Sequence, residues 1–286
     1  MKTFFLLDTH ALIHRFFHAL PPLTTPAGEP IGAVYGLARV VLKILREQKP
    51  DYVAAVFDRP EETFRAKEFK EYKSQRPAPA PELIGQFNRS RELMTKLGLR
   101  VVEMPGFEAD DLIGTLAVKF QNEPDLQIVI LSSDRDILQL VDADKTVAQL
   151  IKKGVSETEL YNETAVVKNF GLKPGQLPEF KGLTGDVSDN IPGVEGVGPK
   201  TATTLLQKFG TLENLFDHLW ELPDKLGNKL RKQKETALFS RRLATINCQA
   251  PLFVQELTDL KIAPIKKEEL AGYFEKLGFK SLKDAL

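Results

Sequence analysis

Nine acidic residues lie in short motifs along this chain of 286 residues, and they are the side chains with the clearest capacity for chemistry. Three of them, Asp8, Asp58 and Asp134, each follow a short apolar run. The nine residues are Asp8, Asp58, Glu108, Asp110, Asp111, Asp134, Asp136, Asp186 and Asp189. Glu108 and Asp111 are three residues apart, as are Asp186 and Asp189, so each pair would share a helix face if its segment is helical.

Carboxylates crowded into one site repel one another unless cations neutralise them. A ligand set made only of oxygen atoms suits Mg²⁺ or Mn²⁺ rather than Zn²⁺. Two such ions can activate water, stabilise a leaving oxygen and hold a phosphodiester in line. The acidic motifs therefore predict a two-metal site for phosphoryl chemistry. The alternative interpretation is that Glu108 to Asp111 favour a helix dipole and that the other acids cap helices.

The sequence lacks the motifs of two other phosphoryl chemistries. It contains no glycine-rich Walker loop that would hold a nucleoside triphosphate. The segment Asp8-Thr-His10 lacks the second aspartate of an aspartyl-phosphate phosphatase. His10, His14 and His18 would line one helix face, where zinc could bridge them, but no carboxylate pattern supports this and packing or solvent exposure is favoured.

A basic segment with interleaved aromatic residues follows Asp58. Its cations are Arg65, Lys67, Lys70, Lys73 and Arg76, and its aromatic residues are Phe64, Phe69 and Tyr72. Bases stack on such rings while cations contact phosphates, so the segment predicts a grip on single-stranded nucleic acid through Arg65, Lys70 and Tyr72. The alternative is a solvated charged helix whose rings pack on the core. The proline-rich residues 77–81 would end this helix and close a loop over the site.

The densest motif is the glycine-rich stretch 185–202. Gly193, Gly196 and Gly198 permit turns, and Pro199 begins a helix with Lys200 and Thr201 in its first turn. The exposed N–H groups at a helix start suit a phosphate. We therefore predict a hairpin that holds a duplex backbone without reading bases, rather than a merely structural turn. A second basic run, 225–242, is equally well explained as a solvated helix face.

The elements that must position these residues are typical of an α/β fold. Residues 3–7, 52–57 and 126–131 are short apolar runs, which predict buried parallel strands, and 101–102 and 146–150 are weaker strand candidates. Helical periodicity covers 31–47, 81–97 and 110–120. In a parallel sheet the strand C-termini share one edge, so the three strand-end aspartates should converge. From about residue 162 onward the sequence predicts only helices.

The amino-acid composition excludes several classes of protein and of metal site. The 39 basic and 39 acidic residues balance, so bulk charge does not argue for nucleic acid. A single cysteine, Cys248, excludes an internal disulfide and a cysteine-based zinc cluster and predicts a buried thiol. The N-terminal run reaches an aspartate too soon for a signal peptide or a membrane anchor, so we expect a cytoplasmic protein with no membrane contact.

Together these motifs resemble the 5′ nuclease domain of bacterial DNA polymerase I, which is related to flap endonucleases and phage 5′ exonucleases. The resemblance is carried by Leu7-Asp8, Phe57-Asp58, Thr63-Phe-Arg65, Glu71-Tyr-Lys73, Glu108-Ala-Asp-Asp111, Ser133-Asp-Arg-Asp136 and 185–202. It implies a PIN-like, mostly parallel sheet core at 1–170 with a helical arch near 59–80. It also implies an all-helical, duplex-binding region at 171–286, with a helix–three-turn–helix element that binds K⁺.

The resemblance implies roles for individual residues as well. All nine acids match active-site positions, and Lys73 and Arg76 match the catalytic basic residues of the arch. Asp8, Asp58, Glu108, Asp110 and Asp111 would mainly hold one ion, and Asp134, Asp136, Asp186 and Asp189 the other. The substrate would be DNA with 5′ flaps or 5′ ends, the protein a monomer, and a DNA polymerase a partner in cis or in trans. Thr9-His10 and Ser133 differ from the residues usual in the family at these positions. These differences bear on the geometry of the loops and on the cleavage rate, and neither removes a ligand.

Two other functions would account for part of these motifs. A single-strand ribonuclease of the PIN type would share the acids, but such proteins generally lack the glycine hairpin. A non-catalytic protein that binds DNA junctions would not need the full set of acids. The sequence therefore favours a structure-specific 5′ nuclease acting in DNA replication and repair.

Overall fold

A six-stranded sheet forms the centre of the computed structural model, which describes residues 1–143, 145–154 and 157–283. The strands are β1 (Lys2–Asp8), β2 (Tyr52–Val56), β3 (Arg100–Val102), β4 (Leu126–Ser132), β5 (Thr146–Lys153) and β6 (Glu157–Tyr161). They lie in the order β3-β2-β1-β4-β5-β6, and every pair is parallel except β5 and β6. The predicted α/β core with a mostly parallel sheet is confirmed. The polar edge strand β6 was not expected.

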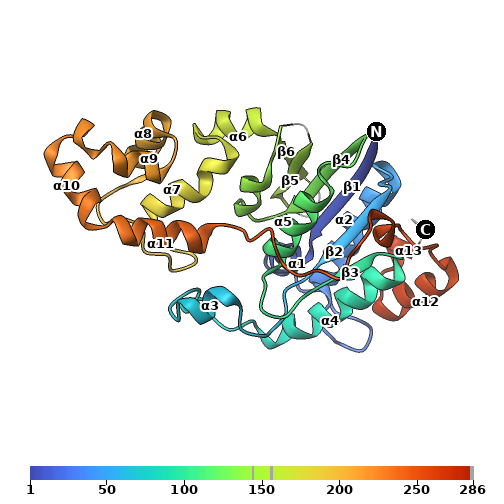
Figure 1. The fold of residues 1–286 in the computed structure, drawn as a ribbon. Helices are drawn as coiled ribbons and strands as arrows, with labels where there is room; N and C mark the ends of the chain where they lie inside the picture. Colours follow the sequence, from blue (N-terminus) through green and yellow to red (C-terminus); the bar gives the residue numbers. More distant parts are fainter. Residues whose placement is uncertain (144, 155–156, 284–286) are drawn as a thin grey trace.

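Helices cover both faces of the sheet (Figure 1). On one face α1 (Thr9–Ala19), α2 (Gly32–Glu47) and α4 (Pro81–Lys96) bury side chains against Phe5, Leu7 and Val53. On the other face α5 (Ala109–Phe120) packs against Phe4, Leu6 and the opposite side of β4. The alternation follows from strand geometry, because successive side chains point to opposite faces. Burial on both faces explains why these strands are apolar throughout.

The chain after the sheet forms a second, helical core beside it (Figure 1). After α6 (Glu163–Phe170), this part contains α7 (Leu177–Thr184), α8 (Pro199–Phe209), α9 (Leu212–Asp217), α10 (Asp224–Lys232) and α11 (Lys234–Ala244). Leu183, Leu206, Leu215 and Leu230 are among the side chains buried together there. These helices agree with the prediction that only helices follow residue 162.

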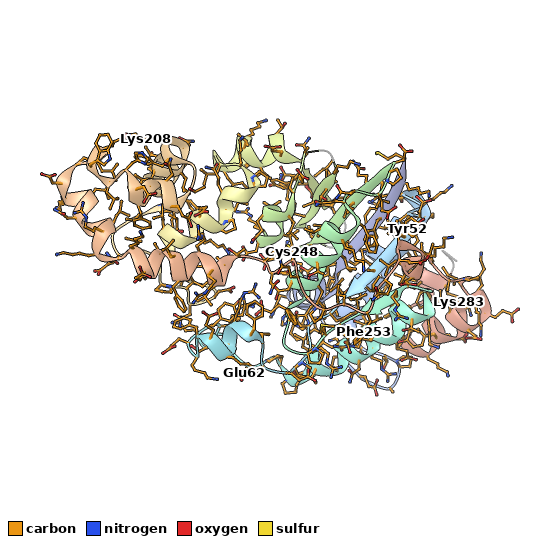
Figure 2. The ribbon with its side chains drawn as sticks, in the orientation of Figure 1. Tyr52, Glu62, Lys208, Cys248, Phe253 and Lys283 are labelled. Atoms are coloured by element: carbon orange, nitrogen blue, oxygen red, sulfur yellow. The ribbon has the colours of Figure 1, made fainter. Side chains whose placement is uncertain are left out.

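The last part of the chain returns to the sheet. Ile246, Val254 and Leu260 pack on the α5 face, while α12 (Lys267–Leu277) and α13 (Lys280–Lys283) pack on the α2 face. Residues 246–283 therefore belong to the α/β core in space, although the sequence placed them with the helical region. Cys248, labelled in Figure 2, lies on this return and is a free, half-buried thiol. No helix among the described residues is long and apolar enough to cross a membrane.

The segment expected to form an arch is helical only at α3 (Phe64–Glu68) and continues in turns to residue 76. This segment packs against the end of α11. In Figure 1, α3 lies below α11. The rings of Phe69 and Phe239 meet edge to face with centroids 5.4 Å apart. Tyr72 is buried with Ile191 and Leu243. The segment therefore closes against the helical region in this conformation.

Candidate active site

The strand-end aspartates converge as the parallel topology predicts. Asp8 ends β1, while Asp58 and Asp134 each stand two residues beyond the ends of β2 and β4, the neighbours of β1. They line a pocket of about 1240 Å³ together with Glu108 and Asp110. Asp136 and Asp186 line the same pocket. Acids far apart in the sequence therefore share one space at the C-terminal edge of the sheet.

Each strand-end aspartate also accepts a hydrogen bond from a backbone N–H at the start of a helical segment. Asp8 Oδ1 accepts from Ala11 N at 3.1 Å, and Asp58 Oδ1 accepts from Ala109 N at 2.5 Å. Asp134 Oδ1 accepts from Asp136 N at 2.9 Å. The capping interpretation and the metal interpretation are thus compatible. In each residue one carboxylate oxygen takes part in this capping, while the residue still lines the pocket.

Three acids lie close enough to share one cation. Asp136, Asp186 and Asp189 each offer an oxygen within 4.8 Å of the others. Asp186 and Asp189 stand in a turn after α7 rather than on a helix, because Asp186 and Ile191 pair through both backbone groups. The Ser188 hydroxyl donates to Asp186 Oδ1 at 2.6 Å and holds this turn. Their closeness therefore comes from the turn and not from helical spacing.

Burial makes the acids at the centre of the pocket costly as anions. Burial, together with the charges of Asp134 and Asp58, raises the pKa of Asp8 to about 7, against hydrogen bonds that lower it. Burial also raises the pKa of Asp110 well above its usual range, and neighbouring acids add to the effect. The pKa of Asp136 rises to about 6 for the same reasons. An all-oxygen set of crowded, buried carboxylates fits divalent cations, which would offset this cost.

Two basic residues in the turns after α3 pair with acids of the site. Lys73 Nζ donates to Glu108 Oε2 at 2.7 Å, and Arg76 donates to Asp189. The two predicted catalytic cations are therefore at the site. Burial lowers the pKa of Lys73, but the charge of Glu108 outweighs it and holds the ammonium protonated.

Sequence reasoning missed Lys181 in α7. Its Nζ donates to Asp186 Oδ2 at 2.6 Å and to Asp136. Burial alone would raise the pKa of Asp186, but hydrogen bonds from Lys181 and Ser188 hold it at about 2. The only local signal was the position of Lys181 one helical turn before the glycine-rich motif.

Hydrogen bonds between residues 71–75 and 189–190, which we call the latch, hold the basic segment over the pocket. Lys73 N donates to Asp189 O at 2.9 Å, and the side chain of Asn190 donates to Glu71 O at 2.8 Å. Gln75 Nε2 donates in turn to Asn190 Oδ1 at 3.0 Å. Lys73 and Asn190 both have positive φ, 55° and 57°. These backbone bends bring the two segments face to face.

The structure corrects the predictions for Asp111 and Arg65. Asp111 is fully buried, and its two oxygens accept from Arg65 at 2.7 and 2.8 Å. The backbone N–H groups of Glu108 and Asn247 donate to the same carboxylate. All its accepting positions face protein donors, so Asp111 is not placed to hold a metal ion in the pocket. Arg65 is buried by the same pairing and is not placed to contact DNA.

Tyr72 also differs from its predicted role. Its hydroxyl donates toward Glu108 Oε2 at 3.2 Å and Asp189 Oδ2 at 3.3 Å, and only 7% of the residue is exposed. A ring buried in this way does not stack on a base in this conformation. Lys70, predicted to contact DNA, is exposed and pairs with Glu62 at 2.7 Å.

The three glycines of the hairpin do not line the pocket and lie between the 186–189 turn and α8. Gly193 has φ of 65°, and a Cβ there would come 2.1 Å from Gly185 N, so only glycine fits. Gly196 has φ of 73°, and Gly198 stands immediately before α8. Lys200 is exposed in the first turn of this helix, with Thr201 half-buried beside it. The helix start and the lysine are therefore both available to an anion.

The row of histidines forms one wall of the pocket. His10 stacks on Phe87 with ring centroids 4.4 Å apart, and its Nε2 lies 3.5 Å from Asp58 Oδ2. His14 and His18 line the pocket farther along α1. Among the described residues, the candidate metal cluster found is made of aspartates and contains no histidine. His10 and His14 are half-buried, and His18 is exposed.

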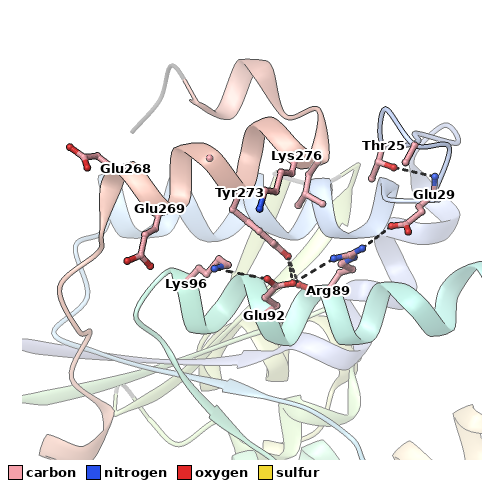
Figure 3. Close-up of a pocket in the computed structure, with 12 residues that line it drawn as sticks. Thr25, Glu29, Arg89, Glu92, Lys96, Glu268, Glu269, Tyr273 and Lys276 are labelled. Carbon is pink, nitrogen blue, oxygen red and sulfur yellow. Dashed lines mark hydrogen bonds and ion pairs between the residues drawn. The ribbon is translucent and has the colours of Figure 1, made fainter.

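A second cleft of about 580 Å³ lies between α4 and α12 (Figure 3). Its charges pair with one another: Arg89 bonds to Glu29 and lies 3.7 Å from Glu92, which also faces Lys96. Tyr273 donates to Glu92 at 3.2 Å. With its cations and anions interleaved, this cleft lacks the concentration of like charge that marks the pocket at the sheet edge.

Comparison with known protein families shows to which family the chain belongs. A model of the 5′-3′ exonuclease N-terminal resolvase-like domain matches residues 3–171, and a model of the 5′-3′ exonuclease C-terminal SAM fold matches residues 172–268. The chain belongs to the 5′-3′ exonuclease family.

The relatives of this chain are of two lengths. It is 40% identical to DNA polymerase I of Bacillus subtilis over 286 residues, which cover all of this chain and 32% of that protein. It is 36% identical to a 5′-3′ exonuclease of Aquifex aeolicus over 283 residues, which cover 99% of this chain and 94% of that one. The chain thus spans about a third of the length of the polymerase I relatives.

Solved structures show the same fold. T5 5′-exonuclease with bound zinc aligns with a TM-score of 0.69 at 21% identity and covers 86% of this chain and 90% of that one. The catalytic core of Rad2 in complex with DNA substrate aligns with a TM-score of 0.64 at 18% identity, covering 99% and 90%. The sheet and the helical region of this chain therefore share their fold with these two structures.

Proposed function

We propose that this chain is a metal-dependent 5′ nuclease that hydrolyses DNA at 5′ flaps and 5′ ends and leaves a 5′ phosphate and a 3′ hydroxyl. The observation that carries the proposal is the convergence of acids from three strand ends, α5 and the 186–189 turn in one open pocket, beside Lys73 and Arg76. The family supports it, as does a neighbour described as a T5 flap endonuclease complex with DNA and metal ions.

The pocket would hold two Mg²⁺ or Mn²⁺ ions. Asp8, Asp58, Glu108 and Asp110 would mainly hold one, and Asp134, Asp136, Asp186 and Asp189 the other. Bound divalent ions supply an activated water and positive charge at the leaving oxygen. The remaining chemistry belongs to the chain itself.

Lys73 and Arg76 would stabilise the phosphate. They are the cations nearest the acids on the side of the latch, and their side chains are long enough to turn from Glu108 and Asp189 toward a phosphodiester. A fixed cation does most where negative charge develops in the transition state. The substrate would therefore replace the pairs that Lys73 and Arg76 now make with Glu108 and Asp189.

The glycine hairpin would hold the duplex beside the cleavage site. Lys200, Thr201 and the N–H groups at the start of α8 would bind the phosphate backbone, with the glycines allowing close approach. K⁺ would bind at hairpin carbonyls. In support, Lys229 Nζ lies 3.4 Å from Gly196 O, so this carbonyl already faces a cation.

We further propose a division of labour along the chain. Residues 1–170, with the arch at 59–80, would carry the chemistry, and the helical region that begins at residue 171 would hold the duplex. In support of this division, one family model ends at residue 171 and the other begins at residue 172. The enzyme would work as a cytoplasmic monomer in DNA replication and repair, alongside a DNA polymerase in cis or in trans.

The test compares a 5′-flapped DNA with an RNA of matched sequence, in Mg²⁺ and in EDTA. We expect cleavage of the DNA that depends on Mg²⁺. Asp134→Asn should slow cleavage by orders of magnitude with unchanged circular dichroism, because the amide keeps the shape but loses the charge. Asp217→Asn, an exposed change on α9, serves as the control.

Other outcomes would reject the proposal. Preferential cleavage of single-stranded RNA would identify a PIN-type ribonuclease instead. Tight binding of the flapped DNA with no cleavage in Mg²⁺ or Mn²⁺ would identify a junction-binding protein.

A further inference from the structure

One buried hydroxyl joins two of the candidate ligands. Ser132 is the last residue of β4 and is fully buried. Its Oγ donates to Asp8 Oδ2 at 2.5 Å and accepts from Asp134 N at 2.8 Å. Asp8 ends β1, which pairs with β4, so the bond crosses between adjacent strands.

The direction of these bonds is fixed by what each group can do. A backbone N–H only donates, so the Asp134 N–H must use a lone pair of the serine oxygen. The ionised carboxylate of Asp8, which is the form that would bind a cation, can only accept, so it takes the single hydroxyl hydrogen of Ser132. With Oδ1 of Asp8 held by Ala11 N, both oxygens of this carboxylate are fixed while the residue faces the pocket.

The same hydroxyl also starts the turn that carries the other acids. Its bond to Asp134 N fixes the first peptide beyond Ser133, and Asp134 Oδ1 then accepts from Asp136 N at 2.9 Å. A displacement of this turn would therefore move Asp134 and Asp136 together. Hydrogen bonds of this kind to metal-binding carboxylates are typically worth 10- to 100-fold in metal affinity or activity.

We propose that Ser132 is a positioning residue that orients Asp8 and the 134–136 turn for cation binding. The inference rests on the proposed metal-dependent function of the pocket. Ser132 itself is fully buried and does not line the pocket, whereas Asp8 and Asp134 do. Its effect must appear in the affinity of the full chain for a divalent cation.

The experiment measures Mn²⁺ binding to the full chain by electron paramagnetic resonance of the free ion, without DNA. Ser132→Ala should raise the apparent Kd for Mn²⁺ by about 10- to 100-fold. Ser132→Thr, which keeps the hydroxyl and suits a strand, should restore most of the affinity. Ser90→Ala is the matched control, since Ser90 is also fully buried but its hydroxyl has no hydrogen-bond partner among the described residues.

Unfolding in EDTA, followed by circular dichroism, separates positioning from folding. Ser132→Ala should weaken Mn²⁺ binding while the chain is still folded at the assay temperature. Equal Mn²⁺ affinity in Ser132→Ala and Ser90→Ala would overturn the inference, whatever the cleavage rates. So would a loss in Ser132→Ala that Ser132→Thr does not restore, when circular dichroism shows both variants folded. A wild-type chain that binds Mn²⁺ but cuts no DNA would reject the nuclease proposal alone.

Discussion

Replacing Asp8 with asparagine should stabilise the metal-free protein at neutral pH while abolishing its activity. Asp8 is 2% exposed, and burial raises its pKa from 3.8 to about 7. The folded state thus holds this proton more tightly than the unfolded chain. Raising the pH from 4 to 7 therefore destabilises the metal-free fold. The amide of asparagine fills the same space without the charge and keeps a carbonyl oxygen that accepts one of the present hydrogen bonds.

The size of this gain in stability follows from the pKa values of Asp8 in the unfolded chain and in the fold. Each pH unit between 3.8 and about 7 is worth about 1.4 kcal/mol, so the carboxylate costs the fold up to roughly 4 kcal/mol above pH 7. The stability gained by Asp8→Asn should be near zero at pH 4 and should grow toward this value by pH 7.5. The same variant should lose Mg²⁺-dependent cleavage, as expected where function requires a destabilised site.

Urea unfolding followed by circular dichroism in EDTA at pH 4.5, 6 and 7.5 measures the effect. Asp217→Asn, which removes an exposed charge, should shift the free energy of unfolding by no more than about 0.5 kcal/mol at every pH. A gain for Asp8→Asn that does not change with pH, or a loss of stability at pH 7.5, would refute the idea that a buried charge at Asp8 opposes folding.

Three further predictions concern the basic residues. Lys73→Ala should lower the single-turnover cleavage rate more than it weakens DNA binding, because its cation acts where charge develops; equal losses in both would make Lys73 only a tether. Lys200→Ala should weaken binding of a 5′-flapped duplex, reduce the salt dependence by about one phosphate contact and leave the free flap strand nearly unchanged, as compared by titration at several salt concentrations. An equal penalty on both substrates would contradict the proposed role of the hairpin. Arg65→Met should cost about 3 to 5 kcal/mol in urea unfolding by leaving Asp111 buried and unpaired, whereas Lys70→Met, at an exposed pair, should cost less than about 1 kcal/mol. Similar costs for the two would show that the Asp111 pairing is not what holds Arg65 in place.

The parts of the site that follow from sheet topology could be predicted from the sequence. Asp8, Asp58 and Asp134 meet because parallel strands end at one edge, and the apolar runs already predicted those strands. The spacing of Glu108 and Asp111, in contrast, fits both ligation and capping. Burial against Arg65, 46 residues away in the chain, decides between them, and no local pattern reports such a contact.

Other features depend on contacts that no single segment specifies. Lys181 looks like an ordinary surface lysine until the turn after α7 brings Asp186 beside it. The apolar face of α12 would suit either core, and its packing on the sheet is set by the return of the chain after Ala244. The strand β6 carries mostly polar residues because it is an edge strand, and it therefore lacks the apolar signal of the central ones.

From the ion pairs between the basic residues and the acids, we expect a divalent cation and a DNA phosphate to bind in this pocket cooperatively. In the closed arrangement Lys73, Arg76 and Lys181 neutralise Glu108, Asp189 and Asp186. A DNA phosphate that recruits Lys73 and Arg76 would leave Glu108 and Asp189 without these partners, and buried carboxylates without a counter-charge are costly. Divalent cations supply the missing charge, so DNA binding that opens the latch and metal binding to the acids should strengthen each other. Reciprocal linkage then requires that Mn²⁺ affinity rise in the presence of uncleaved flapped DNA by the same factor as DNA affinity rises with Mn²⁺.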